Sequence, residues 1–390
     1  MSYFPQWKLK TDGVIAPDER LPANQMVALG LQHVVAMFGS TILAPILMGF
    51  DPNVAVLMSG VGTLLFFLIV GGHVPSYLGS SFAFIGVVMA ATGYVAGSGA
   101  NANISVALGG IVVCGILYAI VGLIVMAIGV QWIEKLMPPV VTGSVVAVYT
   151  PGLTQKLLIL VGLAIAYILY AILTNGMGLG KPIDFSVIAN AAWLGMPMFR
   201  TPVFQLNAIV LIAPVVIILV AENLGHIKAV TAMTGRNLDP YMGRAFLSDG
   251  IATIIAGSVG GPGVTTYGEN IGVMAANRVY STLLFVIAAF FAILLGFSPK
   301  FGALIQTIPQ PVLGGCAVVV FGLIAVAGAR IWVVNQVDFG QNRNLIVAAV
   351  TMILGGGDFT LNLGGFSLGG IGTATFGAIL LNAIMSYKKA

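Results

Sequence analysis

Charged residues are scarce in this sequence. Only 7% of its 390 residues are Asp, Glu, Lys or Arg, whereas soluble domains carry about 25%. So few charges cannot cover the surface of a soluble protein. Hydrophobic residues make up 58% of the chain, and several apolar runs reach the ~20 residues that a helix needs to cross a bilayer. Composition therefore excludes a soluble protein and predicts one integrated domain that crosses a membrane many times.

Cysteine is nearly absent as well. The two cysteines, Cys114 and Cys316, lie far apart in apolar runs, which excludes a disulfide framework. No His-Glu-x-x-His motif of zinc proteases is present, and a net charge of +4 is ordinary for a membrane protein. We therefore expect no enzyme, no metal site, no cofactor and no binding of nucleic acid.

Apolar runs predict the membrane spans. The first 22 residues are polar, and we expect them to form a tail rather than a cleaved signal peptide. Basic residues precede the first run (Lys8, Lys10, Arg20) and follow the last (Lys388, Lys389), so the positive-inside rule places both termini in the cytoplasm. The predicted spans are 25–47, 53–71, 80–93, 105–129, 138–148, 155–175, 207–233, 245–258, 266–278, 279–297, 311–329, 344–355 and 366–386.

Similar segments in the two halves indicate an internal repeat. Residues 137–148 resemble residues 308–322. Each half also has a short interrupted segment, "YLGSSFAFIG" at 77–86 and "GPGVTTYGENIG" at 261–272. One glycine cluster alone is explained by helix packing. Two paired interruptions instead point to a transporter binding site, because unwound backbone in a membrane is tolerated only where it lines a cavity.

Ionisable side chains within spans are the candidate functional residues. Ten of the twelve acidic residues fall at predicted loop or span-end positions, while Glu222 and Glu269 lie within spans. His226 follows Glu222 by four residues, on the same helix face. Such groups are functional by default in a membrane, although Glu222 and His226 would also serve as a structural pair that locks two helices. For His33, a packed histidine with one interhelical hydrogen bond fits as well as a site role.

Four motifs, "LQHVVAMFG", "YLGSSFAFIG", "VAENLGH" and "TTYGENIGVMA", carry a resemblance over nearly the whole chain. The chain resembles the nucleobase–ascorbate transporters (nucleobase:cation symporter type 2), particularly bacterial uracil and pyrimidine permeases. The resemblance implies an all-α polytopic membrane protein with a 7+7 inverted repeat of fourteen segments, and with two short mid-membrane strands in broken segments 3 and 10. The implied divisions are a tail (1–22), a core domain (23–136 with segments 1–4, and 207–297 with segments 8–11) and a gate domain (137–206, and 298–390 with segments 12–14).

The resemblance also implies a function and a site. It implies a bacterial inner-membrane transporter that imports uracil by proton symport, with alternating access of core against gate, as a homodimer through the gate domain. Uracil offers two N–H donors and two carbonyl acceptors, so its site needs carboxylates and backbone amides. Phe82 and Gly268 are implied to act through their amides, and the coupling proton is assigned to the cluster of Glu222, His226 and Glu269 as a unit. The implied substrate contacts are Ser40, Phe82, Glu222, His226, Tyr267, Gly268 and Glu269.

Two rival functions stay open at this point. One is a purine permease of the same family, for xanthine or urate. The other is an anion transporter of the same fold, which would be expected to offer a basic residue or bare helix dipoles at its site instead of two carboxylates.

The chain departs from the family pattern near Val148. The helix that begins at Pro138 runs only about ten residues, or roughly 15 Å, whereas its repeat partner from Pro311 runs on to about Gly328. A true deletion would end unpaired backbone inside hydrocarbon and would reverse the orientation of all later spans. We therefore expect a discontinuity between Val148 and Tyr149 that skips roughly 35 residues, with Cα atoms further apart than the about 3.8 Å of bonded neighbours.

Overall fold

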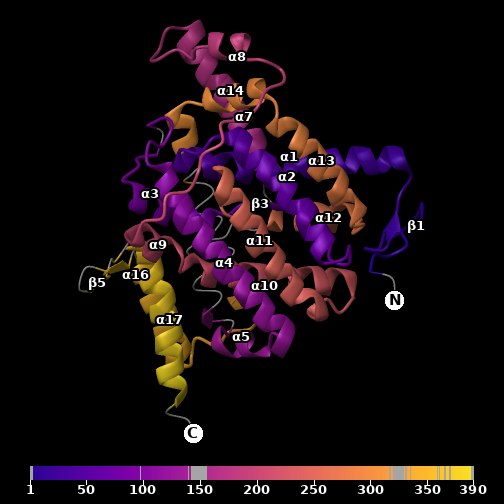
Figure 1. Ribbon diagram of the computed structural model, residues 1–390, viewed down its shortest axis with the longest axis vertical. Coiled ribbons are helices and arrows are strands. Elements are labelled where there is room, and N and C mark those ends of the chain that lie inside the picture. Colours follow the sequence, from indigo (N-terminus) through magenta and orange to yellow (C-terminus); the bar gives the residue numbers. More distant parts are fainter. Residues whose placement is uncertain are drawn as a thin grey trace.

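The computed structural model describes residues 3–96, 98–138, 140–141, 156–315, 318, 329, 332–333, 335–357, 359, 361–363, 366–368 and 370–387. Its helices, drawn in Figure 1, are α1 (Ala23–Met48), α2 (Pro52–Ile69), α3 (Ile85–Thr92), α4 (Ile104–Ile128), α5 (Gln131–Leu136), α7 (Lys156–Ala171), α8 (Ser186–Asn190), α9 (Leu206–Ile212), α10 (Val215–Thr234), α11 (Met242–Val259), α12 (Gly268–Asn277), α13 (Leu283–Gly296), α14 (Pro299–Gln306), α16 (Asn342–Gly356) and α17 (Gly370–Tyr387).

Short elements complete the described part. Two 3-10 turns, η1 (Phe82–Phe84) and η3 (Asp239–Tyr241), precede α3 and α11, and a π turn, η2 (Ile172–Gly176), ends α7. The strands form three separate pairs: parallel β1 (Lys8–Leu9) and β2 (Glu19–Arg20), antiparallel β3 (Leu78–Ser80) and β4 (Val264–Thr266), and antiparallel β5 (Leu361–Leu363) and β6 (Phe366–Leu368).

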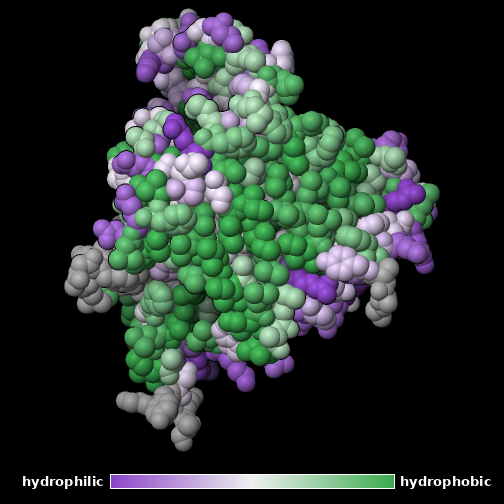
Figure 2. All heavy atoms as spheres, viewed as in Figure 1, coloured by the Kyte–Doolittle hydropathy of each residue, from purple (hydrophilic) through white to green (hydrophobic). Residues whose placement is uncertain are grey.

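Apolar residues cover the middle of one face of the molecule. Figure 2 shows a broad hydrophobic face with hydrophilic residues gathered towards its ends. Among the described residues, four stretches are long and apolar enough to cross a membrane (Ala23–Met48, Pro52–Ile69, Ile104–Ile128 and Leu206–Thr234), and the pair α13–α14, bent by 79°, makes a fifth if it is one span. The chain is a multi-pass membrane protein, as its composition predicts.

The predicted spans differ from the helices in three informative places. The span 207–233 is divided into α9 and α10 at Pro214, which lacks the N–H that would continue the helix. The span 279–297 begins only at Leu283. The span 366–386 opens with a strand, β6, before α17 begins. Most of the predicted spans 138–148 and 311–329, the seam at Val148–Tyr149, Cys316 and the two C-terminal lysines lie outside the described residues, so those predictions stay predictions.

Helices α4 and α11 pack with their backbones in close contact because glycines face each other. A Cβ on Gly122 would lie 2.7 Å from the Cα of Leu247, and a Cβ on Gly250 would lie 2.8 Å from the Cα of Ala119. Small residues are the usual means of joining helices in lipid, where the hydrophobic effect does not drive association. This contact fixes the position of α11, and α11 in turn packs against strand β4.

The two interrupted segments meet at the pair β3–β4. Leu78 pairs with Thr266 and Ser80 with Val264 in an antiparallel register. A threonine from a neighbouring helix completes each strand: Thr63 of α2 accepts from the amide of Leu78 at 2.9 Å, and Thr253 of α11 exchanges hydrogen bonds with the backbone of Val264 at 3.0 and 3.2 Å. These hydrogen bonds from Thr63 and Thr253 satisfy backbone groups that a membrane interior would otherwise leave unpaired.

Candidate functional site

Each strand of the central pair runs directly into the start of a helix. Strand β3 leads into η1 at Phe82, where Ser81 caps the turn by accepting from the amide of Ala83 at 3.2 Å. Strand β4 leads into α12 at Gly268. The first amides of a helix have no acceptor within that helix, and its N-terminus favours negative charge. A helix therefore starts directly after each strand of the pair, at Phe82 in one half of the chain and at Gly268 in the other.

Glu269 lies in the first turn of α12, with 5% of its surface exposed. Its Oε1 accepts a hydrogen bond from the hydroxyl of Ser40, which belongs to α1 and lies 229 residues away in sequence. Ser40 and Glu269, two of the predicted site residues, are thus brought into direct contact. A carboxylate at this position interacts favourably with the helix dipole.

Tyr267 precedes α12 and braces the strand pair. Its hydroxyl donates to the carbonyl of Ser80 at 2.9 Å and accepts from the hydroxyl of Thr41 at 3.0 Å. Its ring lies against Gly79, where a Cβ would come within 2.5 Å of the ring and 2.7 Å of the Thr41 hydroxyl. Both sides of the phenol oxygen are therefore occupied by protein groups, and the predicted contact of Tyr267 with the substrate stays a prediction. Phe82, 8% exposed, packs within the hydrophobic core.

Helix α10 carries Glu222 and His226. The Nδ1 of His226 lies 2.9 Å from the hydroxyl of Thr266, the last residue of β4, so the histidine touches the strand that leads to Glu269. Glu222 is partly buried. Tyr267 lies within electrostatic reach of both Glu222 and Glu269, which places the two carboxylates in one neighbourhood despite their separation in sequence.

Asp249 is a buried acidic residue that sequence reasoning treated as a span-end position, and that interpretation is wrong. It lies in α11 with none of its surface exposed. Its Oδ2 accepts from the side-chain amide of Asn223 at 2.7 Å, from the backbone amide of Thr266 at 3.3 Å and from the hydroxyl of Tyr118 at 3.4 Å. Its position inside the predicted span 245–258 was the signal available in the sequence.

His33 makes the interhelical contact that was one of its two interpretations. The side-chain amide of Asn270, on α12, lies 3.0 Å from the Nδ1 of His33 and donates to its carbonyl at 3.0 Å. The imidazole also packs on Phe285 of α13, with ring centroids 4.9 Å apart. Within the described residues, no group of three or more His, Cys, Asp or Glu side chains is placed to hold a metal ion.

Known proteins similar to this chain are transporters. A model of the permease family matches residues 24–156 and 145–364. The candidate pyrimidine permease RutG of Escherichia coli (strain K12) is 62% identical over 424 positions, covering 99% of this chain and 96% of that protein. The uracil permease of Bacillus caldolyticus is 37% identical (95% of this chain, 94% of that protein), and the uracil permease of Escherichia coli (strain K12) is 36% identical (96% and 94%).

The alignments to these three permeases are longer than the chain itself, at 424, 422 and 417 positions against 390 residues. Because the match at 62% identity runs over 424 positions and this chain has 390 residues, at least 34 positions of that relative have no counterpart here. The two stretches matched by the family model meet within residues 145–156, the region that contains Val148 and Tyr149.

Solved structures with the same fold are also membrane transporters. The inward-facing anion transporter Slc26a9 of the mouse superposes with a TM-score of 0.59 at 10% identity (94% of this chain, 69% of that chain). The transmembrane domain of the cyanobacterial bicarbonate transporter BicA superposes with a TM-score of 0.54 at 13% identity (92% and 97%). At these identities the likeness shows the fold alone, and it confirms the predicted 7+7 inverted repeat with core and gate domains. The family match and the relatives above 30% identity show that this chain belongs to the nucleobase–ascorbate transporter family of permeases, and so is a transporter of nucleobases and not an enzyme.

Proposed function

We propose that the chain imports uracil, or a closely related pyrimidine base, by proton symport. The observation that carries the proposal is the buried placement of Glu269 in the first turn of α12, directly after the strand pair β3–β4 that joins the two halves of the chain. The names of the similar permeases support a pyrimidine substrate.

The chemistry of the site suits a flat ring with alternating donors and acceptors. Glu269 and Glu222 accept hydrogen bonds from the two ring N–H groups, and the amides at Phe82 and Gly268 donate to the carbonyl oxygens. Hydrogen bonds to charged acceptors are worth about 1.5–3 kcal/mol each, so the carboxylates supply the larger part of the selectivity. A base that lacks an N–H at either position leaves a buried carboxylate without its donor.

The coupling proton belongs to the cluster of Glu222, His226 and Glu269. A carboxylate in a low-dielectric site takes up a proton more readily than it does in water, and the imidazole of His226 connects the cluster to β4 through Thr266. Groups that interact this closely exchange protons as a unit. With the proton and the substrate bound together, the loaded core domain carries less charge as it moves.

Transport then consists of the core domain (23–136 and 207–297) moving against the gate domain (137–206 and 298–390), so that the site opens to one side of the membrane at a time. The N-terminal segment lies at the same end of the core as Arg236, Arg244 and Arg278. By the positive-inside rule this end faces the cytoplasm of a bacterial inner membrane. A homodimer formed through the gate domain completes the proposed assembly.

Uptake of labelled uracil by cells that lack their own uracil uptake tests the proposal. We expect uptake to rise as external pH falls and to collapse when a protonophore dissipates the gradient. Uptake driven equally well by a sodium gradient without protons would contradict the coupling. Competition by unlabelled uracil, thymine, xanthine and urate tests the substrate class, and inhibition by xanthine or urate alone would assign a purine permease instead. Uptake of labelled sulfate would assign an anion transporter.

A further inference from the structure

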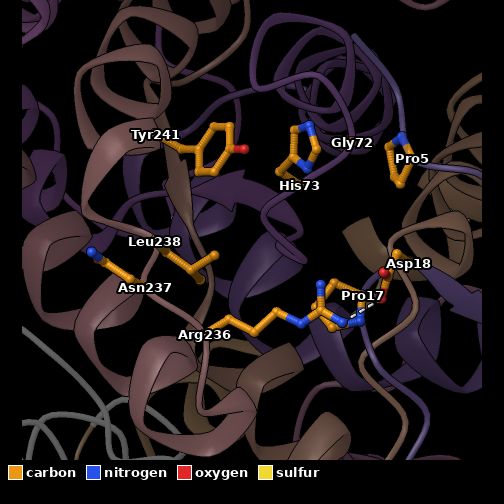
Figure 3. A pocket seen from close by; sticks show the side chains of 9 residues that line it. All are labelled: Pro5, Pro17, Asp18, Gly72, His73, Arg236, Asn237, Leu238 and Tyr241. Carbon is orange, nitrogen blue, oxygen red and sulfur yellow. Dashed lines mark hydrogen bonds and ion pairs between the residues drawn. The ribbon is translucent and has the colours of Figure 1, made fainter. Parts of the chain in front are cut away.

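A cavity of about 320 Å³ lies where the N-terminal segment crosses the end of the core domain (Figure 3). Three stretches far apart in the sequence line it: the N-terminal segment at Pro5, Pro17 and Asp18, the loop after α2 at 72–73, and the connection between α10 and α11 at 236–241. Its volume is at the lower end of small-molecule sites. None of its lining residues belongs to the candidate transport site, so the proposed transport cycle leaves the cavity unused.

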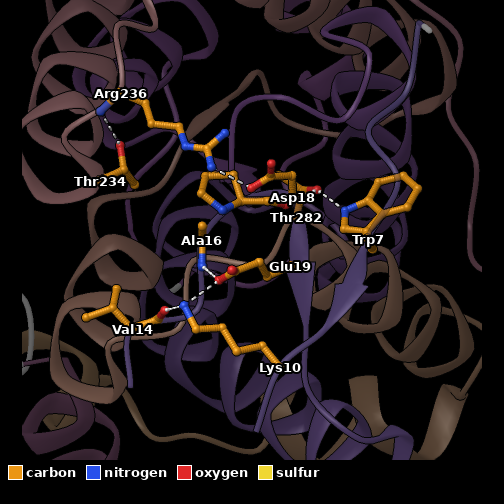
Figure 4. Close-up of polar contacts among 10 residues, drawn as sticks. Trp7, Lys10, Val14, Ala16, Asp18, Glu19, Thr234, Arg236 and Thr282 are labelled. Carbon is orange, nitrogen blue, oxygen red and sulfur yellow. Dashed lines mark hydrogen bonds and ion pairs between the residues drawn. The ribbon is translucent and has the colours of Figure 1, made fainter. Parts of the chain in front are cut away.

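The wall that the N-terminal segment contributes is held firmly in place. The indole of Trp7 donates to the hydroxyl of Thr282 at 2.9 Å, and that hydroxyl donates to the carbonyl of Pro17 at 3.1 Å (Figure 4). Within the segment, Lys10 forms an ion pair with Glu19 at 3.0 Å. These contacts tie residues on both sides of the cavity wall to the start of α13, so the cavity is a built feature of the core domain.

Two charged side chains, those of Arg236 and Asp18, line the cavity and pair with each other. The guanidinium of Arg236 extends along one side and donates to the carboxylate of Asp18 at 2.7 Å. A second guanidinium, that of Arg244, lies 5.6 Å from the ring of Tyr3 and close enough to His73 for its charge to act there. The nearby carboxylate of Asp239 is engaged by Lys228 at 2.9 Å, outside the cavity. Arg236 is therefore the lining group that can bind an anion, provided that the anion displaces Asp18.

The ion pair at the cavity is exchangeable. Arg236 and Asp18 keep 48% and 40% of their side-chain surface exposed, and exposed pairs are weak because solvent screens them. A phosphate group accepts two parallel hydrogen bonds from a guanidinium and carries more charge than a carboxylate. A phosphate therefore competes effectively with Asp18 for Arg236.

The opposite side of the cavity is suited to a ring. The imidazole of His73 stacks on the phenol of Tyr241 with centroids 4.6 Å apart, and Leu238 and Pro5 add apolar surface (Figure 3). We propose that this cavity binds a phosphorylated small molecule, a pyrimidine nucleoside monophosphate, whose phosphate displaces Asp18 from Arg236. The choice of a pyrimidine and of the cytoplasmic side rests on the proposed function, whereas the recognition of a phosphate rests on the cavity alone.

Such a ligand links transport to the fate of its substrate. An imported base is retained in a cell by reactions that attach it to a phosphorylated sugar, and the product of that class of reaction carries both the ring and the phosphate. Binding it would release Asp18, which joins the N-terminal segment to the connection between α10 and α11. Occupancy of the cavity by the product would thereby change the contacts of the core domain, which is the domain that moves the base.

Equilibrium dialysis of the purified full chain with labelled uridine 5′-monophosphate tests binding without any need for transport. We expect saturable binding, at least tenfold weaker competition by uridine, and weak competition by inorganic phosphate. Equal competition by uridine, or no binding at all, would overturn the proposal. The measurement is repeated in phosphatidylcholine nanodiscs with and without phosphatidylglycerol, and loss of nucleotide binding in the anionic membrane would assign the cavity to a lipid headgroup.

Variants separate recognition from fold. Arg236→Gln is expected to weaken nucleotide binding at least tenfold and Arg236→Lys less so, while the matched control Lys228→Gln leaves it unchanged. Asp18→Asn is expected to strengthen binding several-fold, because it removes the competitor; weaker binding by Asp18→Asn, or equal losses in Arg236→Gln and Lys228→Gln, would refute the assignment. Uracil uptake by Arg236→Gln without added nucleotide is expected to match wild type, so failure of the proposed transport function would be seen separately.

Discussion

Replacement of Asp249 by alanine is expected to damage the transport site without touching the substrate. One carboxylate oxygen accepts three hydrogen bonds, from Asn223, Thr266 and Tyr118. Alanine removes the acceptor but leaves the donors buried. The hydroxyl of Tyr118 can turn its one proton to the carbonyl of Leu219 at 3.2 Å instead, so two donors are orphaned: one N–H of the Asn223 side chain and the backbone N–H of Thr266.

The size of the effect follows from those two donors. A buried donor left unsatisfied costs about 1–3 kcal/mol, so Asp249→Ala should destabilise the folded chain by about 2–6 kcal/mol. The Thr266 amide matters most for binding, because it can recover a partner only if β4 shifts. The proposed binding mode requires the native position of Gly268 and Glu269, two and three residues further on. The cost of holding that amide unpaired corresponds to a loss of between about 5-fold and about 150-fold in uracil affinity.

The assay combines uracil binding to purified protein with thermal unfolding in the same detergent. Asp249→Asn keeps one acceptor oxygen and is expected to lose less of both. Thr351→Ala is the matched control, since Thr351 is equally buried but only donates to the carbonyl of Val347 within α16, so its loss leaves no orphaned donor. Wild-type affinity in folded Asp249→Ala would refute the role of this network in positioning β4.

Three further outcomes are expected. Glu269→Gln keeps the shape of the side chain but turns one acceptor into a donor, so uracil affinity should fall by about 1–3 kcal/mol; unchanged affinity in a binding assay would remove Glu269 from the site. Gly79→Ala should abolish uptake at normal expression, because its methyl group collides with the ring of Tyr267; normal uptake would show that this contact yields. Burial, the largest influence, lowers the pKa of His73 below its ordinary value of about 6.5. As pH falls, the unfolded chain therefore binds a proton at His73 before the folded chain does. The contribution of His73 to the stability of the folded state is present above pH ~6.5 and is lost as pH falls further. Thermal unfolding of wild type and His73→Gln across this range checks the sign, and a wild-type advantage that grows towards acid pH would contradict it.

The sequence by itself determined that the protein lies in a membrane, its fold class and the pairing of the two interrupted segments. Scarce charge and long apolar runs require a bilayer, and that inference needs no contact between residues. The paired interruptions at 77–86 and 261–272 predict the strands β3 and β4, because glycine-rich backbone inside a membrane must find partners in another such segment. The sequence also predicts Glu269 as a site residue, since a carboxylate within an apolar span is costly and is functional by default.

Tertiary structure decided which polar groups from distant segments contact one another. Hydropathy reads each residue with its neighbours along the chain, whereas Asp249 draws its partners from α4, α10 and β4 and Ser40 reaches Glu269 across 229 residues. Tyr267 was predicted to contact the substrate. In the fold, its hydroxyl accepts a hydrogen bond from Thr41 and donates one to the carbonyl of Ser80. The cavity at Arg236 likewise exists only because the N-terminal segment folds back over the core. Hydrogen bonds between distant segments depend on how helices pack, and helix packing is set by complementary surfaces that no local pattern records.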